Sequence, residues 1–497
     1  MTSERRNFYT LLGVPRNATT EQLRRAYRQA ALKYHPDRAD APEDNEVFLE
    51  ISQAYETLID PEARKEYDKQ LLEKEEKLAE QAGFVANVLH SRPALLQLDE
   101  PQVHYVLLDL TARRDTKHKR PPVNIAIVID RSTSMQGARL DQVRSATQEI
   151  LKSLEPSDSA SVIAFSDRAE VVVSPDQARD ISAARARLSL LQADGGTEIG
   201  QGLRLGIQEL QRNFTRDGVN HLILLTDGRT YGDEDECIAM ANSVAEQGVA
   251  INGVGIGSDW SDRFLDELAT VTGGGVLFLE SPKAITGLFE GILQSLSKVV
   301  ASRMRLDGSL SQWVDLRSAF RLEPEPMILG DTLPLNLGNL QRDHRIRLLL
   351  EMVIHPIGDP DSLTLAHLTL SGDMVGVQES QALPLQLDIP VTSDPAREAP
   401  PEPIADALSS IALYRMQDKA RHEAELGQSG QAAKRLQNLA TQLLAGGQRE
   451  LAKAALNEAE NLSKSRRLSN QGEKSLKYGT RALLLPARTS ASEGEND

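Results

Sequence analysis

Between residues 123 and 300, short apolar runs alternate with stretches whose apolar residues recur at helical spacing. The apolar runs occupy residues 123–129, 160–165, 222–225, 250–256 and 276–279. Parallel strands need a crossover element between them, and strands that are covered on both faces are apolar throughout. The alternation therefore predicts an α/β domain, assigned to residues 121–299, with a mostly parallel sheet and helices on both faces.

A chain of 497 residues is too long for one core at roughly 150 residues per domain, so further domains are expected on both sides of the α/β domain. Residues 7–72 show apolar stripes at helical spacing, and Asp60 followed by Pro61 is a helix start, so an all-α domain is expected. Residues 73–100 continue from a Lys/Glu-rich run and are predicted to be a charged helical linker.

After residue 300 the apolar period changes to two, most clearly in residues 346–354 and 383–391. This predicts a β-sandwich from residues 300–393, joined by the short strand pattern in residues 101–112, with the α/β domain inserted between them. The prolines in the last run, Pro384 and Pro390, place that strand at an edge.

The C-terminal part reads as helices again. Proline-rich residues 393–403 predict a linker, and apolar stripes predict a helical bundle over residues 404–486. Residues 487–497 are acidic and poor in large apolar side chains, which predicts a disordered tail.

The charge balance limits the partners. The chain has 56 basic and 72 acidic residues, a net charge of −16, which disfavours nucleic acid and anionic membrane surfaces. The only cysteine, Cys237, allows no internal disulfide and fits a reducing compartment. No apolar run approaches the ~18 to 20 residues of a membrane helix, and the N-terminus lacks a signal-peptide pattern. We therefore expect a cytoplasmic protein with no membrane association.

The first candidate site lies in the N-terminal helical domain. Its second helix has a basic row, and residues 21–34 sum to four basic minus one acidic, or +3. A proline ends that helix and fixes the turn in which a histidine and an aspartate flank it. The row alone is equally consistent with a solvated helix face. The residues concerned are Arg24, Arg25, Arg28, Lys33, His35, Pro36 and Asp37.

These features resemble a J domain, the module of DnaJ-type co-chaperones. The resemblance covers residues 7–70 and includes Tyr-Thr-Leu-Leu-Gly-Val at 9–14, the His-Pro-Asp tripeptide and residues 60–68. It implies that His35, Pro36 and Asp37 contact the ATPase domain of a DnaK-class chaperone and trigger ATP hydrolysis, while the basic row docks its acidic surface. With one cysteine, the zinc module of DnaJ is excluded, so client binding must come from elsewhere in the chain.

The second candidate site lies in the α/β domain. Asp130, Ser132 and Ser134 leave the first strand at positions i, i+2 and i+4, Thr197 follows two glycines, and Asp227 follows another apolar strand. Ligands of open α/β sheets bind at the carboxyl ends of the strands, where these oxygens are expected. Hydroxyl and carboxylate oxygens suit a hard divalent cation such as Mg²⁺.

The pattern resembles the metal-ion-dependent adhesion site of a von Willebrand factor A (vWA) domain, which is Asp-x-Ser-x-Ser with a distant Thr and Asp. The resemblance implies that Ser132, Ser134 and Thr197 coordinate Mg²⁺ (or Mn²⁺ or Ca²⁺) directly, and that Asp130 and Asp227 do so directly or through water. The remaining position would be open for a carboxylate from a protein ligand. The alternative is a vWA domain that retains these residues as polar packing.

Together the motifs predict a J-domain co-chaperone that stimulates a DnaK-class ATPase and binds a protein through a divalent cation. The main alternative is a metal-dependent scaffold, for example with a MoxR-type AAA+ ATPase, in which the J domain serves only for localisation. No catalytic triad, carboxylate pair or P-loop lysine is visible, which argues against an enzyme. A hydrolytic metal site is disfavoured because no general base accompanies the ligand set.

Overall fold

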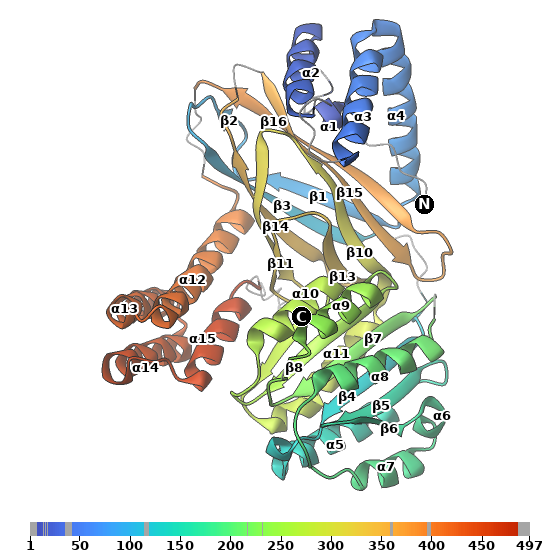
Figure 1. Ribbon diagram of the computed structural model, residues 1–497, viewed down its shortest axis with the longest axis vertical. Coiled ribbons are helices and arrows are strands. Elements are labelled where there is room, and N and C mark those ends of the chain that lie inside the picture. Colours follow the sequence, from blue (N-terminus) through green and yellow to red (C-terminus); the bar gives the residue numbers. More distant parts are fainter. Residues whose placement is uncertain are drawn as a thin grey trace, which may run out of the picture.

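The computed structural model describes residues 7–12, 14, 16, 18–34, 42–113, 119–215, 217–230, 232–357, 361–394 and 399–485. It has four parts: N-terminal helices at one end of the long axis, a β-sandwich in the middle, an α/β domain at the other end, and C-terminal helices beside the last two (Figure 1). The fold class predicted from the sequence is confirmed. The predicted tail, residues 487–497, lies outside the described residues.

The N-terminal domain packs its helices around Tyr9, Leu23 and Ile51, all buried. Asp60 caps the last helix, since its side chain accepts from the backbone N of Glu62 and Ala63 at 3.0 and 2.8 Å. The capping aspartate and the following proline explain why this helix begins where the sequence predicts. The helices are α1 (Phe8–Leu12), α2 (Thr20–Tyr34), α3 (Pro42–Ile59) and α4 (Pro61–Gln81).

The α/β domain has a six-stranded sheet in the order β6-β5-β4-β7-β8-β9, parallel except for β6. Alternate residues of β4 face different cores, Ile127 with helices α5, α7 and α11, and Val128 with α8, α9 and α10. The strands are β4 (Val123–Asp130), β5 (Ser159–Phe165), β6 (Ala169–Val173), β7 (Val219–Thr226), β8 (Val249–Ile256) and β9 (Val276–Leu279). The helices are η2 (Thr133–Met135), α5 (Ala138–Lys152), α6 (Pro175–Ala178), α7 (Ile181–Ser189), α8 (Ile199–Arg212), α9 (Glu234–Ala245), α10 (Asp262–Thr272), η3 (Pro282–Ala284) and α11 (Ile285–Ser297).

The sandwich has two five-stranded sheets, β1-β3-β14-β11-β12 and β13-β10-β15-β16-β2. Strand β3, which precedes the α/β domain, pairs with β14 from Leu110↔Ile346 to Gln102↔Ile354, so the α/β domain is inserted into the sandwich. The strands are β1 (Phe84–His90), β2 (Leu95–Leu96), β3 (Gln102–Ala112), β10 (Val299–Leu310), β11 (Val314–Glu323), β12 (Met327–Gly330), β13 (Leu335–Gln341), β14 (Ile346–Ile354), β15 (Ser362–Met374) and β16 (Gln381–Thr392).

The predicted helical linker over residues 73–100 is wrong beyond Gln81. Helix α4 ends there, and the next residues form β1 and β2 of the sandwich. The reason is visible in the composition: the Lys/Glu-rich run stops at Glu80, and β1 has no Lys, Arg, Asp or Glu and pairs with β3 from Phe84↔Ala112 to His90↔Val106.

Strand β16 contains the two prolines expected at an edge. Among the described residues β16 pairs with β15 along one side, and on the other side only Val391 and Thr392 pair, with β2. Pro384 and Pro390 therefore need not donate to a strand on that side.

Arg321 joins the sandwich to the α/β domain. It is buried, and its guanidinium donates to the carbonyl oxygens of Gly273 and Leu337 at 2.8 and 2.9 Å, and also to that of Gly274. The two glycines belong to the α/β domain, between α10 and β9, so one side chain of β11 bonds to both domains.

Four C-terminal helices complete the chain. Helix α12 packs on the sandwich, because Ile404 and Ile411 share a core with Phe320 and Leu349. Helices α13 and α14 form a second core, and α15 returns to the α/β domain (Figure 1). The helices are α12 (Glu402–Glu425), α13 (Ser429–Ala445), α14 (Arg449–Ser465) and α15 (Asn470–Ala482). Within the described part of the chain, no helix combines the length and the apolar character needed to cross a bilayer.

Candidate metal site and chaperone-binding surface

The predicted metal ligands gather at one end of the α/β sheet. Asp130 ends β4, Asp227 directly follows β7, and these parallel strands are neighbours with Ile129 opposite Leu225. Their carboxyl ends therefore lie at the same edge of the sheet. Strands β4 and β7 are buried along their full length, and Asp130, Ser132 and Asp227 at this edge are buried as well.

Asp130 is buried and held by two hydrogen bonds. Its Oδ1 accepts from the backbone N of Ser132 at 2.8 Å, and its Oδ2 accepts from the hydroxyl of Thr226 at 2.7 Å. Burial raises the pKa of the Asp130 carboxyl, although both hydrogen bonds oppose the shift. A nearby cation would favour the charged form of this carboxylate.

The two serines connect Asp130 to Asp227. The hydroxyl oxygens of Ser132 and Ser134 are 3.0 Å apart, and the hydroxyl of Ser134 donates to Asp227 Oδ1 at 2.6 Å. Four of the five predicted ligands thus form one hydrogen-bonded cluster.

Thr197 joins this cluster from a neighbouring loop. Gly195 has a φ of +83°, and its carbonyl oxygen accepts from the backbone N and the hydroxyl of Thr133, both at 3.1 Å, which ties the two loops together. A Cβ on Gly228 would lie 3.0 Å from the Thr197 hydroxyl oxygen. A residue larger than glycine at 228 would therefore crowd Thr197, which places Thr197 beside Asp227.

Two further residues belong to the cluster and were not predicted. The Thr226 hydroxyl bonds to Asp130, and the Arg139 guanidinium pairs with Asp227 and donates to the Ser134 carbonyl oxygen at 3.1 Å. Thr226 could have been found as the one hydroxyl residue at the end of an apolar strand. The sequence did not indicate a role for Arg139, because basic residues in the first turn of a helix are common on protein surfaces.

The donor set fits a hard divalent cation. Three hydroxyl and two carboxylate side chains gather at this edge, and Asp130 is buried with hydrogen-bond donors but no paired cation among the described residues. The described residues contain no group of three His, Cys, Asp or Glu side chains able to hold a metal ion. A cation here would therefore depend on the hydroxyl oxygens and on an oxygen from outside the chain.

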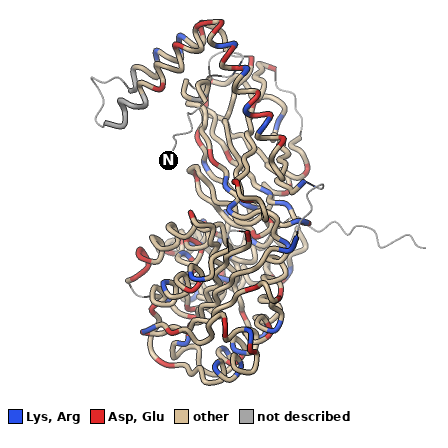
Figure 2. The backbone as a smooth tube through the Cα atoms, turned by 90° about the vertical axis from the view of Figure 1, so that its right-hand side faces the viewer, with Lys and Arg blue, Asp and Glu red and all other residues tan. Residues whose placement is uncertain are grey.

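The candidate chaperone-binding surface on α2 lies only partly within the described residues. Arg24, Arg25 and Arg28 are exposed on α2, and within the described residues none of them forms an ion pair. Basic and acidic residues are interspersed along the chain, so this row is a local feature (Figure 2). Lys33 lies in the last turn of α2, with its side chain outside the description. The tripeptide His35, Pro36 and Asp37 lies outside the described residues.

Cys237 is buried in α9. Burial and the nearby carboxylate of Asp233 raise its pKa to about 12. A buried thiol with a raised pKa is poorly placed to act as a nucleophile.

Comparison with known families identifies three segments. The von Willebrand factor type A domain family matches residues 124–291, and the DnaJ domain family matches residues 7–68. The chain is thus a vWA-domain protein in its central part, and it carries a DnaJ domain at its N-terminus. Residues 402–486 match the Sll0103-like C-terminal alpha-helical domain.

Two relatives cover different parts of the chain. Uncharacterized protein sll0103 from Synechocystis sp. is 28% identical over 344 residues, which is 67% of this chain and 81% of that protein. Chaperone protein DnaJ 2 from Aquifex aeolicus is 52% identical over 66 residues, 13% of this chain and 18% of that protein. The similarity to DnaJ is therefore confined to the J domain.

One solved structure has the same fold over most of the chain. A von Willebrand factor type A protein from Catenulispora acidiphila covers 80% of this chain and 96% of its own, with a TM-score of 0.64 and 18% identity. At this identity the likeness concerns the fold alone.

Proposed function

We propose that this chain is a J-domain co-chaperone that stimulates a DnaK-class ATPase and binds a client or partner protein through a divalent cation at the vWA domain. ATP hydrolysis belongs to the partner, and the chain itself acts by binding. The cytoplasm is the proposed location, since a single cysteine fits a reducing compartment. The observation that carries the proposal is the presence, in one chain, of a DnaJ domain and of the clustered oxygen ligands of the vWA domain.

The DnaJ domain supports the chaperone half of the proposal. Exposed arginines on α2 offer positive charge to an acidic surface, which mainly accelerates association. His35, Pro36 and Asp37 would then contact the ATPase domain, as the resemblance implies.

The vWA cluster supports the metal half. Ser132, Ser134 and Thr197 would coordinate Mg²⁺ (or Mn²⁺ or Ca²⁺), with Asp130 and Asp227 bound directly or through water. When Asp130 and Asp227 bind through water, only neutral hydroxyl oxygens of this chain contact the ion directly, so a partner's Asp or Glu side chain is favoured at the open position. The bound ion would supply a bridge between the two proteins.

The two modules lie at opposite ends of the long axis, separated by the sandwich (Figure 1). A protein held at the vWA domain would therefore not compete for space with a chaperone at the J domain. This separation suits a chain that brings two partners together.

A single-turnover ATPase assay tests the chaperone half. A bacterial DnaK is mixed with the full chain, with His35→Gln, or with His422→Gln, which changes an exposed histidine of α12. We expect the full chain and His422→Gln to accelerate hydrolysis and His35→Gln to lose the effect. Equal rates with and without the full chain would favour the metal-dependent scaffold, for example with a MoxR-type AAA+ ATPase.

Calorimetric titration with Mg²⁺ and Mn²⁺ tests the metal half. Binding is expected for the full chain and for Asp307→Ala, a half-exposed carboxylate of the sandwich, but not for Asp130→Ala. A pull-down with and without EDTA then separates the partners: those lost on chelation are vWA ligands, and a DnaK-class chaperone should remain. Identical isotherms for all three proteins would remove the metal site.

A further inference from the structure

A polar cavity of about 290 Å³ lies between the loops at the carboxyl end of the vWA sheet and helices α12 and α15. The vWA side contributes Arg229, Trp260 and Arg263, and α15 contributes Lys474. The cavity is therefore built jointly by two domains.

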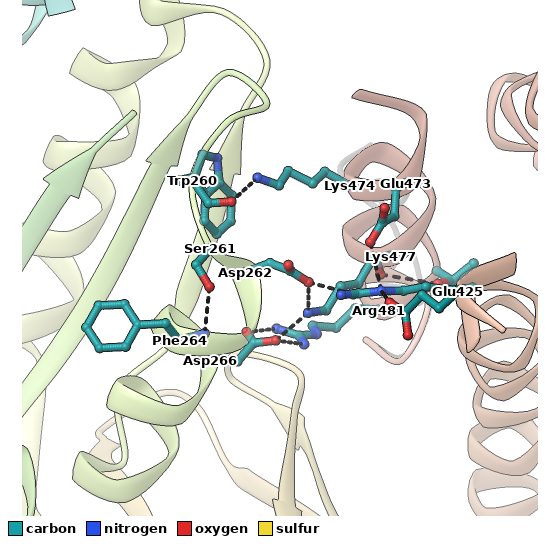
Figure 3. A network of polar contacts seen from close by, with 12 residues as sticks. Trp260, Ser261, Asp262, Phe264, Asp266, Glu425, Glu473, Lys474, Lys477 and Arg481 are labelled. Atoms are coloured by element: carbon teal, nitrogen blue, oxygen red, sulfur yellow. Dashed lines mark hydrogen bonds and ion pairs between the residues drawn. The ribbon is translucent and has the colours of Figure 1, made fainter. Parts of the chain in front are cut away.

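The walls of this cavity are held together by buried ion pairs. Asp262 on α10 pairs with Arg421 of α12 at 2.7 Å and also with Lys477 of α15, and Asp266 pairs with Lys477 at 2.8 Å and with Arg481 at 2.7 Å. Figure 3 shows the side chains of Asp262 and Asp266 on α10 and those of Lys477 and Arg481 on α15 pointing toward one another. A network of this kind, with each carboxylate between two cations, keeps α15 seated on the vWA domain.

Three cations at the cavity have no carboxylate partner among the described residues. Lys474 donates to the carbonyl oxygens of Ser258 and Trp260, and its ammonium lies 4.0 Å from the centre of the Trp260 ring. Arg229 donates to the carbonyl oxygen of Asp259 at 3.2 Å, and Arg263 is exposed. Burial lowers the pKa of Lys474 to about 8, which indicates that its charge is incompletely compensated.

Three carboxylates line the cavity, and all of them lie against one guanidinium. Asp262, Glu425 and Glu473 all pair with Arg421, at 2.7, 3.2 and 2.7 Å, and Asp262 has Lys477 as a second partner. The lining has four cations, Arg229, Arg263, Arg421 and Lys474, against these three carboxylates, so its net charge is positive. Of the four, Arg229, Arg263 and Lys474 form no ion pair among the described residues.

The cavity adjoins the metal site. Arg229 follows Asp227 by two residues, and Gly257, which precedes the cavity residue Ser258, lies so close to Arg139 that a Cβ would be 3.3 Å from its guanidinium nitrogen. Arg139 in turn pairs with Asp227. A peptide that binds at the metal site can therefore continue into the cavity.

From this arrangement we infer that the cavity is a second anion subsite, which takes an acidic side chain of the same protein segment whose carboxylate binds the metal. The inference rests on the proposed function for the metal-bound carboxylate, while the subsite itself depends only on Arg229, Arg263 and Lys474. The vWA ligand is thus an acidic segment with at least two carboxylates. The net charge of −16 disfavours nucleic acid as the source of the anion.

The subsite can be tested without a metal. The chain has two tryptophans, so Trp313→Phe leaves Trp260 as the only one, and its fluorescence reports on the cavity. Succinate is titrated in EDTA into this chain, into the same chain with Arg229→Ala and Arg263→Ala, and into a control with Arg185→Ala and Arg187→Ala on the exposed side of α7. We expect saturable quenching or enhancement that the first pair of substitutions weakens at least about tenfold, as loss of a charge-assisted hydrogen bond does, and the second leaves unchanged.

A second titration adds Mg²⁺ and capped peptides with one Asp, or with two Asp separated by zero to three glycines. At least one two-Asp peptide should bind about tenfold more tightly than the one-Asp peptide, and Arg229→Ala with Arg263→Ala should abolish that advantage while Mg²⁺ binding persists. Equal affinities, or no succinate response in EDTA, would overturn the subsite. A succinate response that persists while Mg²⁺ changes no peptide affinity would support the subsite and overturn the metal-dependent half of the proposed function.

Discussion

The guanidinium of Arg139 pairs with the carboxylate of Asp227 inside the candidate metal site. The side chain of Asp227 has no exposed surface, and that of Arg139 is 37% exposed. The guanidinium of Arg139 therefore pairs with the same carboxylate, that of Asp227, which a bound divalent ion would also use. Arg139 can turn outward to solvent, whereas Asp227 cannot, so a bound ion would displace the arginine rather than the aspartate.

The first prediction follows from this competition. Arg139→Ala should tighten Mg²⁺ binding by about three- to tenfold, because one like charge is removed from a partly screened site. Calorimetric titration measures the change, with Arg144→Ala as a control, since Arg144 pairs with Asp141 on the same helix. Weaker binding in Arg139→Ala would instead mean that the arginine holds Asp227 in position for the metal.

The metal cluster could be predicted because its residues are close in sequence to the ends of strands. Asp130, Ser132 and Ser134 follow one buried strand and Asp227 another, and the register of parallel neighbours then brings them together. Arg139 could not be predicted, because nothing in the sequence shows which way a long side chain in the first turns of a helix will point.

The second prediction concerns Arg321. Its guanidinium donates to three carbonyl oxygens at the junction of sandwich and vWA domain, those of Gly273, Gly274 and Leu337, and also to that of Glu325 at 3.0 Å. Arg321→Met leaves these buried acceptors without donors and should lower the free energy of unfolding by about 2 to 4 kcal/mol. Urea unfolding followed by circular dichroism measures it. The half-exposed Arg305→Ala should change stability by less than about 0.5 kcal/mol. A similarly small effect of Arg321→Met would show that the junction does not depend on Arg321.

The sandwich shows where sequence patterns fail. Strands β14 and β16 were visible because their apolar residues alternate over many positions. Strand β1 was missed because it has only seven residues and directly follows a long charged helix, so its apolar pattern is too short to recognise. Its pairing with β3 becomes visible only in the three-dimensional structure. The ion pairs between α10 and α15 could not be predicted either, because they join residues more than 200 positions apart in the sequence.

The third prediction is that acid releases the C-terminal helices from the vWA domain. Burial alone would raise the pKa of Asp262 and Asp266, but the neighbouring cations outweigh it and lower both: Lys477 and Arg421 for Asp262, Arg481 and Lys477 for Asp266. Because the pKa of each aspartate is lower in the folded chain than in the unfolded chain, its ion pairs stabilise docking fully above the unfolded pKa of about 3.9. This stabilisation is lost progressively as the pH falls below that value. Docking should therefore persist at pH 5 and weaken progressively below about pH 4.

Trp260 reports this release. Its side chain is buried and lies 5.7 Å from the Tyr478 ring of α15, so undocking should shift its emission to the red in the Trp313→Phe chain. Asp262→Asn with Asp266→Asn should give the same shift at pH 7, since removing one partner of a buried ion pair costs about 3 to 5 kcal/mol. Asp176→Asn in α6 serves as the control. Unchanged emission in the double variant at pH 7 would contradict a docking role for the network.

The fourth prediction separates the charge of Lys474 from its packing. The cavity binds an anion best when Lys474 is protonated, so succinate affinity should fall as the pH rises through about 8, the lowered pKa of Lys474. The groups that face it are Asp262, Arg229, Glu473 and Asp259, and carboxylates and guanidinium groups do not normally change charge between pH 7 and 10. Lys474→Arg should retain affinity over this range, because an arginine stays charged.

Stability should change in the opposite direction, which distinguishes the two effects. The folded-state pKa of Lys474 is below its unfolded value of 10.5, so between pH 8 and 10.5 the unfolded chain holds more protons and stability rises with pH. A loss of succinate binding over that interval therefore cannot come from undocking of α15. If affinity were instead independent of pH in the unaltered chain, or fell equally in Lys474→Arg, the ammonium of Lys474 would not be a ligand of the anion.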